Sequence, residues 1–287
     1  MRQQPGWVRA LRRLVSARLA PGLVMAALLL PALSACRPPI QYAPAQNAPA
    51  QQTPTILTGS LPPGSPLPSE AECAARVHRS SWEPRPENHD ANMRVPSQAQ
   101  IARLGPWGPA TGLDPKADGL RQQMTGNFTG TTDEILQWVA CKWGFDPDIV
   151  RAEAVVESHW NQGFQGDHTD ERQYCPPGAW DGSGCDQSYG ILQIKWYYFQ
   201  DAWPMSRDDT AFSAEYAYAM LRACYEGWTS YLNERDPLPG YPRYHAGDIW
   251  GCLGRWFSGS WYSQGAVDYI AKVETALAEK AWLSPGF

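Results

Sequence analysis

Hydrophobic residues recur at helical spacing through the second half of the chain. Ile135, Leu136 and Val139 lie in the first such segment, which we expect Thr132 to cap and Gly144 to end. The whole pattern predicts helices at about residues 132–143, 146–159, 209–232, 246–257 and 263–282. The expected architecture is therefore a mostly α single domain.

The second of these helices carries the clearest start signal. Asp146 suits an N-cap, and Pro147 suits the first helical position because its missing N–H needs no partner there. After this helix ends, at about His159, residues 161–187 carry five Gly, two Pro and two Cys. This composition predicts a loop or a small hairpin, which we interpret as an irregular insert in the helical domain.

Residues 69–130 precede the helices and show little periodicity. Ser69 and Glu72 have the spacing of a capping box, which predicts a short helix carrying Cys73. A second short helix is expected over 98–104, among Pro, Gly and Asn. We expect an irregular N-terminal extension packed on a main domain of residues 131–287.

The first 35 residues have the pattern of an export signal. They carry five arginines and no acid, and an apolar run from Leu19 to Leu33 is too short and too interrupted for a comfortable membrane span. The run ends in Leu33-Ser34-Ala35-Cys36, which resembles the signal of bacterial lipoproteins. That resemblance implies cleavage before Cys36, acylation of this cysteine and a lipid anchor in a membrane of the cell envelope. The alternative is an ordinary cleaved signal peptide with an incidental cysteine.

Residues 36–68 would then form the lipidated cysteine and a tether. This segment holds nine prolines and a single charge, Arg37, so it cannot bury a core of its own. An extended spacer of this kind would let a globular body reach away from a lipid surface.

Charge argues against one class of partner. Without the five arginines of the signal, 19 cations face 29 anions, and there is no basic stripe. An anionic body has little to offer the phosphates of a nucleic acid, so we expect no nucleic-acid partner. The composition, with 43% hydrophobic and 12% aromatic residues, is that of a globular protein.

Six cysteines remain after Cys36, and an even number outside the cytoplasm predicts disulfides. Cys175 and Cys185 flank a Pro- and Gly-rich stretch and are expected to form a local crosslink. Cys224 and Cys252 lie on consecutive predicted helices and are candidates to join them. The candidates are Cys73, Cys141, Cys175, Cys185, Cys224 and Cys252. Metal-ligand spacings such as C-x-x-C are missing, so we expect no metal and no cofactor.

Glu157 is the candidate catalytic residue. It falls on one helix face with Val150 and Ala154, so an otherwise apolar stripe ends in a carboxyl group. Desolvation raises the pKa of a carboxyl, as a general acid near neutral pH requires. A solvated glutamate at a helix end is the alternative.

The surrounding strings favour catalysis. Glu157-Ser158, followed by Ser188-Tyr189-Gly190-Ile191-Leu192-Gln193-Ile194, resembles the lytic transglycosylases of the soluble-transglycosylase and goose-type lysozyme group (the SLT domain). The resemblance extends over about residues 131–283 and implies a lysozyme-like fold. It also implies cleavage of the β-1,4 bond between N-acetylmuramic acid and N-acetylglucosamine in the glycan strands of peptidoglycan, with a 1,6-anhydromuramoyl product. The enzyme would thus be a carbon–oxygen lyase of the cell wall.

The resemblance also implies roles for single residues. Glu157 would be the general acid and base, Ser158 and Gln193 would hold the substrate or Glu157, and Gly190 would let the backbone approach a sugar closely. Tyr189 belongs to the same expected substrate-binding set. Flat aromatic rings near these motifs suit sugar faces, and some of the following are expected to line subsites: Trp160, Trp180, Tyr189, Trp196, Tyr197 and Tyr198.

The third motif of the family, Ala-Tyr-Asn-x-Gly, is altered here. Trp256 and Phe257 occupy the positions of its Tyr and Asn, so the amide is lost. We expect Trp256 to form the wall for a sugar ring and Tyr262 or Ser258 to supply a polar contact, with Tyr244 as another candidate. A non-catalytic, glycan-binding envelope lipoprotein is the alternative suggested by this change.

A second carboxylate would direct the reaction to hydrolysis, as in a lysozyme, because it would activate a water. Acidic residues of the insert are the candidates, together with Glu153 one helical turn before Glu157. They are Asp167, Asp170, Glu171, Asp181 and Asp186.

Overall fold

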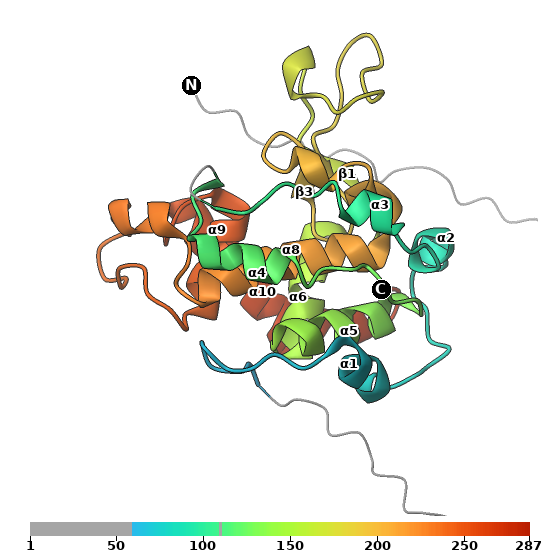
Figure 1. Ribbon diagram of the computed structural model, residues 1–287, viewed down its shortest axis with the longest axis horizontal. Helices are drawn as coiled ribbons and strands as arrows, with labels where there is room; N and C mark the ends of the chain where they lie inside the picture. The colour runs from blue at the N-terminus through green and yellow to red at the C-terminus, as the bar shows by residue number, and fades with distance from the viewer. Residues whose placement is uncertain (1–58, 109–110) are drawn as a thin grey trace, which may run out of the picture. The chain divides into compact units, whose positions relative to one another are not determined.

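The computed structural model describes residues 59–108 and 111–287, which are mostly helical (Figure 1). The export signal, Cys36 and the tether as far as residue 58 lie outside the described residues. No helix within the described ranges is both long enough and apolar enough to cross a membrane.

Five longer helices form the body of the domain. They are α5 (Thr132–Trp143), α6 (Pro147–Ser158), α8 (Thr210–Tyr225), α9 (Ile249–Ser258) and α10 (Gln264–Glu279). Helix α10 packs against α6 and α9, and α5 packs against α8. The core between them is aromatic: Trp138, Trp143 and Tyr218 are fully buried. The prediction of a mostly α chain is confirmed.

The ends of these helices follow local capping chemistry. The N-cap of α5 is Thr131 and not Thr132, because the Thr131 side chain accepts a hydrogen bond from the backbone of Glu134 and leaves Thr132 as the first helical residue. Gly144 ends α5 in the left-handed conformation, at φ 69°. Asp146 caps α6 as predicted, through a bond from the Asp148 amide.

Several predicted helices are shorter in the structure. Helix α10 ends at Glu279 instead of residue 282, because Lys280 takes a left-handed φ of 45°. Helix α8 ends at Tyr225 instead of residue 232, because Gly227 takes a left-handed φ of 84° and turns the chain; a short 3₁₀ helix then covers Ser230–Glu234. Likewise α3 covers Gln98–Ile101. The other short helices are α1 (Glu70–Arg76), α2 (His89–Asn92), α4 (Asp118–Arg121) and α7 (Met205–Asp208).

One strand of the insert, β1, belongs to a small antiparallel sheet in the order β1–β2–β3. Its strands are β1 (Gln165–Gly166), β2 (Ser188–Tyr189) and β3 (Ile194–Lys195). Tyr189 pairs with Gln165 on one side and with Ile194 on the other. Beyond this sheet, the rest of the insert projects from the helical body, yellow in Figure 1.

Three disulfides crosslink the described chain. Cys175–Cys185 closes the insert and Cys224–Cys252 joins α8 to α9, so both predicted pairs are confirmed. The third bond, Cys73–Cys141, ties α1 of the N-terminal extension to α5.

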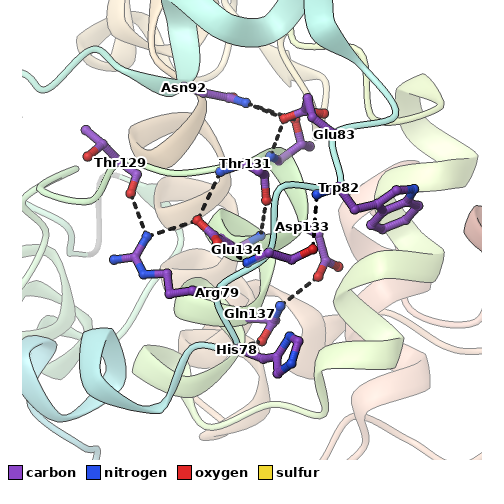
Figure 2. Close-up of polar contacts among 12 residues, drawn as sticks. His78, Arg79, Trp82, Glu83, Asn92, Thr129, Thr131, Asp133, Glu134 and Gln137 are labelled. Carbon is purple, nitrogen blue, oxygen red and sulfur yellow. Dashed lines mark hydrogen bonds and ion pairs between the residues drawn. The ribbon is translucent and has the colours of Figure 1, made fainter. Parts of the chain in front are cut away.

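Polar contacts also hold the N-terminal extension on α5 (Figure 2). The Glu83 carboxylate accepts bonds from the Thr132 amide, at 2.6 Å, and from the Asn92 side chain, at 3.0 Å. Arg79 pairs with Glu134 at 2.9 Å. Residues 59–68, which the sequence assigns to the tether, also contact the body: the buried guanidinium of Arg222 donates to the carbonyls of Leu61 and Pro62.

Candidate functional site

Glu157 lies in the last turn of α6, and its partner comes from α10. The hydroxyl of Tyr269 donates a hydrogen bond to Oε1 of Glu157 at 2.6 Å. Tyr269 is itself buried. Glu157 keeps some exposed surface, so one carboxyl oxygen is held while the group stays within reach of solvent.

The surroundings favour the protonated form of this carboxyl. Burial is the largest cause that raises the pKa of Glu157, to about 8, and the negative charge of Asp167 acts in the same direction. The hydrogen bond from Tyr269 acts the other way, because it stabilises the carboxylate. At neutral pH the group therefore carries a proton that it can transfer.

Tyr269 lies within residues 131–283, the stretch that resembles the transglycosylases, but no motif quoted from the sequence assigns it a role. A signal was present: Tyr269 shares the inner face of α10 with Ala266, Ile270 and Val273, all buried. A hydroxyl on such an apolar stripe needs a polar partner in the core. Here that partner is Glu157, 112 positions away in the sequence.

The altered third motif lies directly beside this pair. The ring of Phe257 stacks on Tyr269, with centroids 4.7 Å apart and planes 6° from parallel. Phe257 is 56% exposed, so it covers one face of Tyr269 and presents its own other face outward. Phe257, at the position of the family's Asn, thus contacts the ring of Tyr269 instead of making amide contacts.

Trp256, the preceding residue, is both anchored and partly exposed. Its indole N–H donates to the carbonyl of Leu192 at 3.1 Å, and its ring stacks on Phe199 with centroids 5.7 Å apart. The bond to Leu192 ties α9 to the turn that carries Gly190 and Gln193. Trp256 therefore lies next to residues 188–194, which we call the second motif, as expected of a residue that forms a wall for a sugar ring.

Ser158 is buried and acts on the protein itself. Its hydroxyl lies 2.8 Å from the carbonyl of Ile191 and 3.4 Å from that of Ala154, so the shorter bond joins the end of α6 to the second motif. The resemblance implies that Ser158 holds the substrate or Glu157; the two bonds of its hydroxyl in the structure go to backbone carbonyls and not to the Glu157 carboxyl.

Gly190 and Gln193 also contact backbone carbonyls of the protein. A Cβ on Gly190 would lie 2.3 Å from the carbonyl oxygen of Ser206, and φ is 83°, so packing on α7 requires the glycine. The amide of Gln193 donates to the carbonyls of Phe164 and Gly190 at 3.1 and 2.8 Å.

Three expected contact residues have structural partners. Tyr189 is buried and donates to the carbonyl of Asp186. The hydroxyl of Tyr262 bonds to Asp248, the N-cap at the far end of α9 from Trp256. The hydroxyl of Tyr244 bonds to the carbonyl of Cys224. None of these bonds reaches Glu157.

A row of aromatic rings continues from Trp256 toward the insert. Successive centroid distances are 5.7 Å from Trp256 to Phe199, 6.4 Å on to Tyr198, 5.2 Å on to Tyr197 and 4.7 Å on to Tyr174. We call these five residues the aromatic row. Tyr198 is 69% exposed and Tyr197 is 42% exposed. Trp180 and Trp196 are partly buried, and Trp160 is fully buried.

Glu153, one turn before Glu157, is completely buried. Burial is the largest cause that raises its pKa, to about 8, and the charge of Glu157 acts in the same direction. The hydroxyls of Tyr218 and Tyr269 face this carboxyl and act in the opposite direction. A carboxyl so enclosed cannot reach a substrate, so Glu153 is not the second catalytic carboxylate.

Among the insert acids, Asp167 is the one whose charge acts on Glu157. Its carboxylate accepts bonds from Ser188 at 2.7 Å and from Lys195 at 3.1 Å. Asp181 bonds to the amides of its own loop, and Asp186 faces His168 at 3.4 Å.

Within the described ranges, His, Cys, Asp and Glu side chains form no group of three able to hold a metal ion. The comparisons with known proteins yielded no relative: no family model, no curated protein and no solved structure matches the chain.

Proposed function

We propose that the protein is a lytic transglycosylase of peptidoglycan with a lysozyme-like domain, in which Glu157 is the single acid and base. One observation carries this proposal: a carboxyl whose pKa is raised to about 8 receives a 2.6 Å hydrogen bond from Tyr269 while staying partly open to solvent. A protonated acid is what the departure of a sugar alkoxide requires.

The reaction needs two proton transfers at the same carboxyl. Glu157 first gives its proton to the glycosidic oxygen, and the bond between that oxygen and the muramoyl C1 breaks. The muramoyl C6 oxygen then bonds to C1, and its hydroxyl proton passes to the Glu157 carboxylate. The 1,6-anhydro ring forms, and the carboxyl regains its proton without the addition of water.

Tyr269 assists the intermediate stage of this cycle. When Glu157 has lost its proton, the Tyr269 hydroxyl stabilises the resulting carboxylate through the bond at Oε1. Phe257 stacks on the same tyrosine ring and helps to fix its orientation. The pair thus orients Glu157 without the Asn amide of the family's third motif.

The aromatic row supplies a surface for the glycan. Its rings begin at Trp256, which is bonded to the second motif, and they continue to Tyr174 in the disulfide-closed insert. Aromatic faces suit the apolar faces of pyranose rings. We assign this surface to sugars on one side of the cleaved bond.

Hydrolysis of the same bond is the second candidate, and Asp167 is the observation that favours it. Its charge acts on Glu157, and a carboxylate near the acid is what a lysozyme needs to activate water. The products separate the two reactions, because a hydrolysed reducing end is heavier than an anhydro end by one water. Analysis of muropeptides released from purified sacculi by mass spectrometry therefore decides between them.

The proposed location is the cell envelope, with the domain held to a membrane by lipid on Cys36. The disulfides of the body suit an extracytoplasmic protein of this kind.

A further inference from the structure

The chain takes an unfavourable path directly after the catalytic helix. His159 and Trp160 are consecutive non-glycine residues with φ of 53° and 62°, both in the left-handed region. A side chain with a Cβ disfavours this region, and a bulky residue such as tryptophan is rare there. Such a turn persists only where surrounding contacts hold it in place.

The N-terminal extension supplies those contacts. Nε of Arg85 donates to the carbonyl of His159 at 2.6 Å, and the Asn88 side-chain amide donates to the carbonyl of Trp160, also at 2.6 Å. The Asn88 side-chain oxygen accepts the backbone N–H of Gln162 at 2.9 Å. Arg85 and Asn88, which lie three residues apart in the extension, thus bind the backbone of two successive residues of the left-handed turn.

The same bonds continue to the second motif. The Gln162 side chain accepts the backbone N–H of Ile191 at 2.9 Å, and the Ile191 carbonyl accepts the hydroxyl of Ser158. Asn88, Gln162 and Ile191 therefore form a connected path that returns to the residue next to Glu157. The path thus connects the turn after α6 with the segment that carries Ile191.

Asn88 is itself held firmly. It is 1% exposed, and its amide also donates to the hydroxyl oxygen of Thr132 at 3.0 Å. That hydroxyl donates in turn to Glu83, which accepts the Thr132 amide as well. The Glu83 carboxylate, shown in Figure 2, thus fixes the first turn of α5 and the extension to one another.

We propose that residues 82–88 form a clamp that positions Glu157, with Arg85 and Asn88 as its positioning residues. The proposal rests on the proposed function of Glu157 and deepens it. It assigns a role to part of a segment that lies outside the stretch resembling transglycosylases. The isolated domain of residues 131–287 would then contain the catalytic carboxyl without the groups that hold its turn.

The test compares two buried asparagines of the extension in the full chain. Asn88→Ala removes the bonds to Trp160 and Gln162. Asn92→Ala is the matched control, because Asn92 is 2% exposed and, like Asn88, donates to the Thr132 hydroxyl; its other bond goes to Glu83, and it bonds to neither Trp160 nor Gln162. Misplacing a catalytic group by about 1 Å costs on the order of a hundredfold in rate. We expect kcat on sacculi to fall at least tenfold in Asn88→Ala, with KM changed less than threefold, and kcat to stay within threefold of wild type in Asn92→Ala.

A second readout does not depend on cleavage. Hydrogen exchange at the backbone amides of Gln162 and Ile191 should accelerate at least tenfold in Asn88→Ala and stay near wild type in Asn92→Ala. Should Asn88→Ala not fold, Arg85→Ala tests the clamp at a partly exposed site through the same kcat measurement, together with hydrogen exchange at residues 158–162.

The outcomes are distinguishable. Wild-type protein that releases no muropeptide contradicts the proposed function, and exchange still reports on the clamp. Wild-type cleavage with equal kcat and equal exchange in the two asparagine variants overturns the clamp and leaves the proposed function standing.

Discussion

Removal of the Tyr269 hydroxyl should produce two effects of opposite sign. Tyr269→Phe keeps the ring that stacks on Phe257 and deletes the 2.6 Å bond to Glu157. Hydrogen bonds to charged groups contribute about 1.5–3 kcal/mol, and a tenfold change in rate corresponds to about 1.4 kcal/mol. If the bond acts fully on the forming carboxylate, kcat falls by about 10- to 100-fold.

The pH profile should move the other way. The Tyr269 bond lowers the pKa of Glu157, so its loss raises that pKa further above about 8. Activity needs the protonated acid; it is therefore present below the pKa and lost as the pH rises through it. The alkaline limb of the rate should lie near pH 8 in wild type and higher in the variant.

The assay is the initial rate of muropeptide release from sacculi between pH 5 and 10. Tyr218→Phe is the matched control, because it removes a hydroxyl from another fully buried tyrosine, one that faces Glu153. We expect the control to keep kcat within about threefold of wild type. An unchanged kcat in Tyr269→Phe, or an alkaline limb that moves to lower pH, would refute the reasoning.

Three further predictions concern Glu153, the aromatic row and the anchor. Because the pKa of Glu153 is raised, the folded state binds the proton of this carboxyl more tightly than the unfolded state does. The contribution of Glu153 to stability is therefore fully present below about pH 4.5 and is lost as the pH rises through about 8. Glu153→Gln should therefore flatten the fall of the unfolding free energy between pH 5 and 9, measured by urea denaturation, and an equally steep fall in the variant would argue against a buried neutral acid. Trp256→Ala should lower kcat/KM by about 2- to 13-fold, since a stacking contact contributes about 0.5–1.5 kcal/mol beyond its buried area; a Tm measured in parallel must show the protein folded, and wild-type kcat/KM in a folded variant would remove Trp256 from the glycan surface. Cys36→Ala should abolish labelling with a fatty-acid analogue, and the variant protein should either move from the membrane to the soluble fraction or stay unprocessed; equal labelling of wild type and variant would exclude lipidation of Cys36.

Local signals in the sequence predict most of the helical frame. Asp146-Pro147 and Gly144 mark helix ends correctly because their effects depend on their own backbone and its nearest neighbours. The assignment of Thr132 as a cap fails by one residue, because either threonine can cap and Glu134 selects Thr131. Cys175–Cys185 is predictable for the same reason of proximity.

The site is less accessible to sequence reasoning because its partners come from distant segments. Glu157 is marked by its helix face, whereas Tyr269 reaches it from α10 and Asn88 holds its turn from the N-terminal extension. An asparagine in a Pro- and Gly-rich stretch carries no sequence pattern that points to such a contact. Gly190 shows a related limit: the sequence marks the glycine, but the Ser206 carbonyl that lies against it comes from a distant segment and cannot be identified from the sequence.

The most direct test of the central claim is mass spectrometry of the muropeptides that wild-type and Glu157→Gln protein release from purified sacculi. The account predicts 1,6-anhydromuramoyl ends from wild type, and at least a hundredfold less release from the variant, which keeps the size of the side chain but has no proton to transfer. Release by Glu157→Gln at a rate near that of wild type would contradict the account.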